Sequence, residues 1–232
     1  MKTIGLIGGL SWESSKEYYR IINETVNERL GGLHSAKCIL YSLDFAESRE
    51  IQQTKGWDEM TKILIDTAQR LEAAGADIVL ICTNTMHKFM PEIQREIHVP
   101  ILHIADATAE KVLEKGLKKV GLLGTKMTME EDFYKGRIGE KFGINVLVPD
   151  KDERDFIETV IIDELCVGKM NASSKKRFKQ IIGKLVENGV EGIILGCTEI
   201  PLLIKQGDVN VPIFDTAEIH AKAAVEYALK ET

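Results

Sequence analysis

The sequence has few of the features that mark metalloproteins or disulfide-stabilised proteins. Its four cysteines, at positions 38, 82, 166 and 197, are far apart and form no Cys-x-x-Cys pair, so neither a zinc knuckle nor a disulfide framework is predicted. The five histidines show no His-x-His or His-Glu-x-x-His spacing, which argues against a metal site. We therefore expect a cytoplasmic protein with reduced thiols and no bound metal.

Long apolar runs and an excess of positive charge are also missing. No uninterrupted apolar stretch approaches the ~20 residues that a membrane span needs, and the first residues lack the layout of a signal peptide. The formal net charge of −6 argues against a nucleic-acid partner, because phosphate binding needs a concentrated basic face. The basic residues at 175–179 fit the solvated face of an amphipathic helix. We expect neither a membrane nor a nucleic acid as partner.

What the sequence does contain is an internal repeat. Ile81-Cys-Thr-Asn-Thr85 in the first half returns as Gly196-Cys-Thr-Glu199 in the second, and each copy follows an apolar run. Gly5-Leu-Ile-Gly8 returns in the same way as Gly121-Leu-Leu-Gly124. Both offsets are close to half the chain length, which predicts a duplicated α/β unit. Such a duplication can place one thiol or hydroxyl loop on each side of a shared cleft.

Short runs rich in Ile, Val and Leu alternate with helical patterns, which predicts an α/β fold with parallel sheets. The predicted strands are 3–7, 38–43, 77–81, 101–104, 120–123, 145–148, 192–195 and 212–214. A first helix is expected to begin at Ser11 or Glu13, and two further helices to end near Gly75 and Gly168. The last helix is predicted at 216–229.

Two domains are predicted from this order of elements. Residues 1–104 and 211–232 are expected to form the N-terminal α/β domain, and residues 105–210 the C-terminal one. In this arrangement the last helix folds back on the first domain. Each half is long enough to build its own core.

Loops that leave the predicted strands are rich in glycine, hydroxyl groups and thiols. Ligands of open parallel sheets bind beyond the carboxyl ends of the strands, and glycines let backbone amides approach an anion. The loops are 8–11, 82–85, 124–126, 196–199 and 215–216. A nucleotide site is not predicted, because the first loop is not Gly-x-Gly-x-x-Gly and no P-loop lysine is present. His87 follows the second loop and either donates to a substrate or has a helix-capping or partly exposed role.

Cys197 is the strongest candidate for a reactive side chain. It follows a glycine at a predicted strand end, ahead of a short helix that opens at Glu199 or Ile200. A helix N-terminus lowers the pKa of a thiol, and we expect that effect here. A buried, inert thiol is the alternative. Cys38 and Cys166 are predicted to be structural, although Cys166 could face the cleft.

Six segments carry a resemblance to a known family. They are GLIGGLSWES (5–14), ICTNTMHK (81–88), LLGTKMTME (122–130), DFYKGR (132–137), DELCVGK (163–169) and LGCTEIPLL (195–203). On these segments the whole chain resembles the aspartate/glutamate racemase superfamily, and within it the broad-specificity amino-acid racemase branch. The resemblance implies two Rossmann-like domains related by a pseudo-twofold axis, and a homodimer. It also implies racemisation of a small amino-acid substrate without pyridoxal phosphate or any other cofactor.

The resemblance further implies two proton-transfer residues, one on each side of the substrate α-carbon. One is Cys197. The other precedes Asn84-Thr85, where this chain has Thr83 and its cysteine stands one place earlier, at Cys82. The internal repeat alone would align Cys82 with Cys197, but we favour the family anchor. Neighbouring side chains of an extended segment point opposite ways, so Cys82 would then aim into the core.

A threonine hydroxyl at this position changes the expected chemistry. It is a far poorer base than a thiolate, although it can donate a proton. We therefore expect Thr83 and Cys197 to perform unequally, while the equilibrium between the enantiomers stays near unity.

The remaining substrate contacts are inferred from the resemblance and from loop position. They are the Leu10 amide, Ser11, Arg49, Gln52, Asn84, Thr85, Thr125, Cys166, Thr198 and Glu199. Arg49 is expected to clamp a carboxylate through its planar guanidinium, with ordinary surface contacts as the alternative for it and for Gln52. Many family members have a lysine where this chain offers Cys166, so strict aspartate specificity is not expected.

Three functions stay open at this point. The leading one is an amino-acid racemase that uses Cys197 and Thr83, acting on aspartate, glutamate or a broader set. The second is a hydantoin racemase or an arylmalonate-type decarboxylase on the same fold, of which the decarboxylase needs only one cysteine. The third is a non-catalytic amino-acid-binding protein. The Ser11-Trp12-Glu13 segment favours the amino-acid branch.

Overall fold

The computed structural model describes residues 1–230 and divides the chain into two compact α/β units. Unit 1 contains residues 1–103 and the chain from His220 onward, and unit 2 is the continuous stretch 104–219. The second boundary therefore lies later than the expected break after residue 210. The reason is that strand Ile213–Asp215 pairs with strand Gly192–Gly196, so it belongs to the sheet of unit 2.

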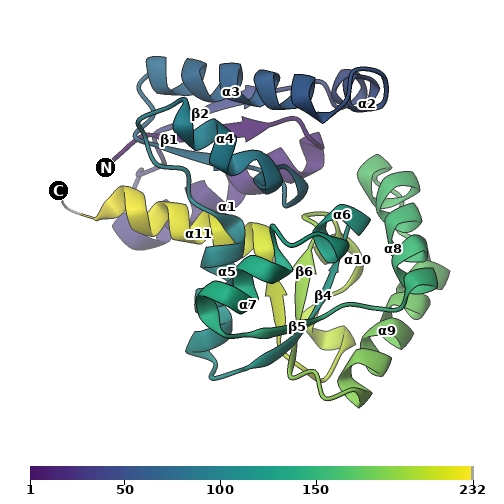
Figure 1. Ribbon diagram of the computed structural model, residues 1–232. Helices are drawn as coiled ribbons and strands as arrows, with labels where there is room; N and C mark the ends of the chain where they lie inside the picture. The colour runs from purple at the N-terminus through teal and green to yellow at the C-terminus, as the bar shows by residue number, and fades with distance from the viewer. Residues whose placement is uncertain (231–232) are drawn as a thin grey trace. The chain divides into compact units, whose positions relative to one another are not determined.

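Unit 1 is built on a three-stranded parallel sheet in the order β2-β1-β3. Its elements are β1 (Ile4–Gly8), α1 (Trp12–Leu30), β2 (Cys38–Ser42), α2 (Phe45–Thr54), α3 (Trp57–Ala73), β3 (Ile78–Ile81), the 3-10 helix η1 (Thr85–Phe89) and α4 (Met90–Arg95). The central strand β1 is buried along its whole length, whereas the edge strand β2 exposes its last three residues. Helix α3 lies on one face of the sheet and α1 on the other (Figure 1).

The predicted strand at 101–104 is only a single bridge, so that prediction was wrong. Ile101 pairs with Val79, and the Val79 N–H donates to the Pro100 carbonyl at 2.9 Å. Helix α5 (Ile104–Glu114) begins a few residues later and ends the pairing. The apolar residues of this run therefore divide between one bridge and the start of a helix.

Unit 2 contains a four-stranded parallel sheet in the order β5-β4-β6-β7. After α5 its elements are β4 (Lys119–Gly124), α6 (Lys126–Glu130), α7 (Lys135–Phe142), β5 (Asn145–Leu147), α8 (Lys151–Asp163), η2 (Leu165–Val167), α9 (Ala172–Glu187), β6 (Gly192–Gly196), α10 (Ile200–Leu203), η3 (Gln206–Asp208) and β7 (Ile213–Asp215). Helices α8 and α9 cover one face of the sheet, and α5 and α7 lie toward the other (Figure 1). The two central strands are almost entirely buried.

Glycines end the central strands of both sheets because the backbone around them is crowded. Gly124 and Gly196 are paired at the carboxyl ends of β4 and β6. A Cβ on Gly124 would lie 2.7 Å from the carbonyl oxygen of Gly196. In unit 1, a Cβ on Gly9 would lie 1.9 Å from the carbonyl oxygen of Leu43, and Gly9 has a φ of 78°. Only glycine fits these positions, so the repeated glycines mark the points where the loops leave the sheets.

The last helix, α11 (Thr216–Leu229), has the predicted bounds. From His220 onward it belongs to unit 1, where the Lys2 N–H donates to the Ala228 carbonyl at 2.9 Å. Figure 1 shows this part of the chain beside α1. The C-terminal helix is thus part of unit 1 from His220 on. Within residues 1–230, no helix is long and apolar enough to cross a membrane.

Candidate functional site

Cys197 lies directly beyond β6, and its thiol is hydrogen-bonded to the side chain of Glu199. Its side chain is 8% exposed, and its Sγ donates to Oε2 of Glu199 at 2.9 Å. The Thr198 hydroxyl donates to the same carboxylate oxygen at 2.8 Å. In this bond the thiol is the donor and the carboxylate oxygen the acceptor. The thiol and a buried carboxylate are therefore in direct hydrogen-bond contact at the carboxyl end of β6.

The pKa of Cys197 is raised well above its usual range, contrary to the expectation of a lowered value. Burial is the largest cause, followed by the electrostatic influence of the Glu199 carboxylate and of the neighbouring Cys166 thiol. Helix α10 has only four residues, and Glu199 itself occupies its N-cap position. A carboxylate thus stands where the helix terminus would otherwise favour a thiolate, and the resting residue is a thiol.

Cys82 and Thr83 differ sharply in their surroundings. Cys82 is 1% exposed, and burial raises the pKa of its thiol. Its N–H donates to the Ile7 carbonyl at 2.9 Å, which continues the sheet pattern beyond β3. Thr83 is half-buried. Cys82 is enclosed in the core, which leaves Thr83 as the more accessible of the two groups.

Two side chains hold the backbone on either side of Thr83. The Ser14 hydroxyl donates to the Cys82 carbonyl at 2.7 Å, and Nδ1 of His87 lies 2.8 Å from the Thr83 carbonyl. His87 is 1% exposed, so the expected partly exposed role was wrong, and its side chain makes no capping hydrogen bond to η1. The sequence analysis missed Ser14, whose only signal was its place in the first turn of a helix that follows a strand end.

The loop after β1 is strained and contains an unsatisfied hydroxyl. Ser11 occupies the N-cap position of α1 without a capping hydrogen bond, and its φ of 123° is one that non-glycine residues rarely adopt. Its buried hydroxyl has no hydrogen-bond partner among the described residues. The neighbouring Gly9 N–H, by contrast, donates to the Ser15 hydroxyl at 2.8 Å. Strain and an orphaned polar group in one loop are features of ligand-binding sites. Leu10 is buried beside them.

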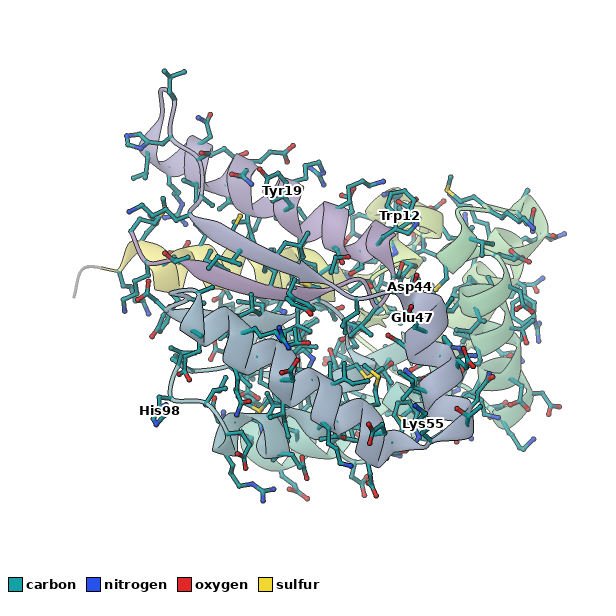
Figure 2. The ribbon with its side chains drawn as sticks, turned by 90° about the horizontal axis from the view of Figure 1, so that it is seen from above. Trp12, Tyr19, Asp44, Glu47, Lys55 and His98 are labelled. Carbon is teal, nitrogen blue, oxygen red and sulfur yellow. The ribbon has the colours of Figure 1, made fainter. Side chains whose placement is uncertain are left out.

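Arg49 and Gln52 lie on α2, a separate helix that the sequence did not predict. They are one turn apart and so share a face of the helix. The Nε2 of Gln52 is buried without a partner, and the half-buried Arg49 makes no ion pair within residues 1–230. Asp44 starts α2 by accepting from two backbone N–H groups at its N-terminus (Figure 2). Among the described residues, the Gln52 amide thus lacks a hydrogen-bond partner and the Arg49 guanidinium lacks an ion pair, and both lie on the helix that follows the edge strand β2.

The predicted site residues fall into two groups, one at the carboxyl edge of each sheet. In unit 1 they are Leu10, Ser11, Arg49, Gln52, Thr83, Asn84 and Thr85, after β1, β2 and β3. In unit 2 they are Thr125, Cys197, Thr198 and Glu199, after β4 and β6, together with Cys166 in η2. Thr125 caps α6, where its hydroxyl accepts from the Thr128 N–H at 3.3 Å. Within the described part of the chain, no group of three or more His, Cys, Asp or Glu side chains could hold a metal ion.

Comparison with known proteins identifies relatives along nearly the whole chain. The profile of the family described as Asp/Glu/hydantoin racemase matches residues 7–224. The broad specificity amino-acid racemase RacX of Bacillus subtilis is 26% identical over 170 residues, which cover 72% of each chain. A crystal structure from Yersinia pestis, provisionally described as an Asp/Glu racemase, is 50% identical with a TM-score of 0.92 and covers 99% of this chain and 100% of its own. An aspartate racemase homologue from Pyrococcus horikoshii is 42% identical with a TM-score of 0.86 over the same shares.

Proposed function

This chain belongs to the Asp/Glu/hydantoin racemase family, and from that premise we propose that it is an amino-acid racemase that needs no pyridoxal phosphate. The observation that carries the proposal is the Cys197 thiol, held 2.9 Å from a buried carboxylate at the carboxyl end of β6. A thiol whose proton can pass to a neighbouring base is the group that α-proton abstraction requires.

In the proposed reaction, Glu199 accepts the proton of Cys197, and the resulting thiolate removes the α-proton of one enantiomer, the L form by analogy with the family. Thr83, or a water that it holds, then delivers a proton to the opposite face of the α-carbon and regains one from solvent, while Glu199 releases to solvent the proton that it accepted. Burial and the nearby negative charges oppose the thiolate in the free enzyme. The α-ammonium of a bound amino acid brings a positive charge close to the sulfur, which offsets that opposition.

We propose that donors of unit 1 bind the substrate carboxylate. Ser11 and Gln52 have buried polar atoms without partners, and the Arg49 guanidinium makes no ion pair among the described residues. Buried donors of this kind are costly unless a ligand satisfies them. At the side-chain end of the substrate, Cys166 offers no positive charge, which supports a range of amino acids rather than aspartate alone. Asn84, Thr85, Thr125 and Thr198 complete the proposed contacts.

We also propose that the protein forms a homodimer. Trp12 and Tyr19 are 61% and 53% exposed on α1, and Figure 2 shows them two turns apart along that helix. Leu40 and Tyr41 are exposed on the edge strand β2. Apolar side chains beside an open strand edge are suited to pairing with a second copy across a twofold axis. The four free cysteines support a reducing, cytoplasmic setting.

The function is tested by incubating the protein with each of a panel of L- and D-amino acids in D2O. Chiral chromatography measures inversion, and NMR measures deuterium at the α-carbon. We expect both for at least one amino acid, and neither for a Cys197→Ser variant. Absence of exchange and inversion across the panel would refute the racemase. Loss of CO2 from an arylmalonate in the same preparation would favour the decarboxylase instead.

A further inference from the structure

Three imidazole rings and a phenol are buried together in unit 1. His87 in η1, His103 just before α5, His220 in α11 and Tyr18 in α1 are each 5% exposed or less. The ring centroids of His87 and His103 are 4.8 Å apart, and those of His87 and His220 are 5.4 Å apart. We call these four residues the histidine cluster. Four segments distant in sequence meet there, beside the loop that carries Thr83.

Hydrogen bonds to backbone carbonyls fix the proton positions in two of the rings. The Leu102 carbonyl can only accept, so Nε2 of His220 donates to it at 2.9 Å, and the Tyr18 hydroxyl donates to Nδ1 at 2.8 Å. Burial, and then the charge of His87, lowers the pKa of His220 to about 3, so this ring is neutral near pH 7. In the same way, the Thr83 carbonyl can only accept, so Nδ1 of His87 carries a proton.

The peptide groups on both sides of Thr83 are held by buried side chains. The carbonyl of the preceding peptide, that of Cys82, accepts from the Ser14 hydroxyl at 2.7 Å. The carbonyl of the following peptide accepts from His87 at 2.8 Å, and the Thr83 N–H donates to the Ile81 carbonyl at 2.8 Å. Peptide groups are planar, and a β-branched side chain has few χ1 rotamers. The direction of the Thr83 hydroxyl is therefore set by these bonds.

We propose that His87 and Ser14 are positioning residues that aim the Thr83 hydroxyl at the α-carbon during reprotonation. The inference rests on the proposed racemase function and adds to it two residues that touch neither substrate nor reacting atoms. The rest of the histidine cluster keeps the His87 ring in place, because His103 and His220 pack beside it and Tyr18 anchors His220. Proton delivery depends steeply on distance and alignment, so a rotated peptide slows it.

Mispositioning of Thr83 differs measurably from loss of folded protein. After Cys197 removes the α-proton, the intermediate has two fates. It regains a solvent-derived proton from Cys197 on the same face, which gives exchange with retention, or it receives one on the opposite face, which gives inversion. Unfolding lowers both rates equally. A displaced Thr83 lowers inversion alone, so the ratio of exchange to inversion reports its position.

The test uses three variants and one control, assayed in D2O with the enantiomer that Cys197 deprotonates. In His87→Asn the amide nitrogen takes the place of Nδ1, whereas in His87→Gln it takes that of Nε2. Ser14→Ala removes the other bond. The control is Thr25→Val, because Thr25 is also a buried hydroxyl on α1 that donates to a backbone carbonyl, that of Ile21 at 2.7 Å. NMR and chiral chromatography give the two rates.

We expect His87→Gln and Ser14→Ala to raise the ratio of exchange to inversion by about tenfold or more, and His87→Asn and Thr25→Val to leave it near the wild-type value. An unchanged ratio in His87→Gln and Ser14→Ala, even with lowered thermal stability, would overturn the inference and leave both residues purely structural. Equal ratios in the Asn and Gln variants would overturn the role of Nδ1. If the wild-type protein itself neither exchanges nor inverts any amino acid, the proposed function fails before any substitution is made.

Discussion

Two substitutions of Cys197 should be equally inactive and differ in stability. Cys197→Ser replaces the thiol by a hydroxyl of similar volume that still donates to Glu199, whereas Cys197→Ala removes the donor. Loss of the proton-transfer group should lower turnover by about 10²- to 10⁴-fold in both variants. Stability separates them, because Glu199 is 3% exposed and keeps only the Thr198 donor when the alanine is introduced.

The size of that difference follows from the charge of the acceptor. A hydrogen bond to a charged group contributes about 1.5–3 kcal/mol, so the alanine variant should be less stable than the serine variant by that amount. For a chain of this length, each kcal/mol corresponds to about 2–4 °C in the melting temperature. Scanning calorimetry and urea unfolding of the three proteins at pH 7 measure the difference.

The catalytic role of Cys197 and the strength of its hydrogen bond can be refuted separately. A serine variant that keeps more than a tenth of wild-type turnover would remove Cys197 from the chemistry. An alanine variant as stable as the serine variant would mean that the thiol is not bonded to an ionised carboxylate. A serine variant that unfolds below the alanine variant would contradict the assignment of the thiol as donor.

Further predictions concern Cys82, Thr83 and His220. Cys82→Ala should change turnover little and lower the free energy of unfolding by about 1–2 kcal/mol. Thr83→Cys should raise the kcat of the direction in which residue 83 abstracts the proton. Loss of activity in Cys82→Ala with normal activity in Thr83→Ala would show that Cys82, and not Thr83, is the second proton-transfer residue. His220, with its pKa lowered to about 3 against about 6.5 when unfolded, is neutral in the fold and gains a proton on unfolding at acid pH. The contribution of neutral His220 to the free energy of unfolding is therefore complete above pH 6.5 and is lost as the pH falls, by about 2 kcal/mol between pH 7 and pH 5. His220→Gln should flatten this part of the dependence of urea unfolding on pH.

Much of the architecture could be predicted because local signals and the fold agree. The core strand β1 is an unbroken apolar run, and α11 has the predicted first and last residues. The run at 101–104 looked equally strand-like, but a helix begins at Ile104. Apolar periodicity cannot separate these cases in so short a run. Likewise α2 was missed, because its exposed helical turns carry no long apolar stripe.

The candidate site shows where sequence reasoning ends. The Gly-Cys-Thr-Glu segment singled out Cys197 and Glu199 as candidates, but the direction of the thiol pKa shift depends on where the carboxylate points. Oε2 of Glu199 lies 2.9 Å from the sulfur, and no spacing rule contains that distance. Ser14 was missed for a similar reason, since its role is a bond to Cys82, 68 residues away. Contacts of that kind exist only once the strands are paired.

Unit 1 has a consequence for how the protein is made. Its sheet precedes unit 2 along the chain, yet the helix segment that brings His220 to Tyr18 and Leu102 is translated only after all of unit 2. While the chain is still on the ribosome, the Tyr18 hydroxyl and the Leu102 carbonyl have no such partner, whereas the continuous unit 2 is already complete. Domains generally fold as units during synthesis. The inserted unit can therefore fold first, and nascent chains or products of premature termination expose an unfinished N-terminal unit to proteases and chaperones.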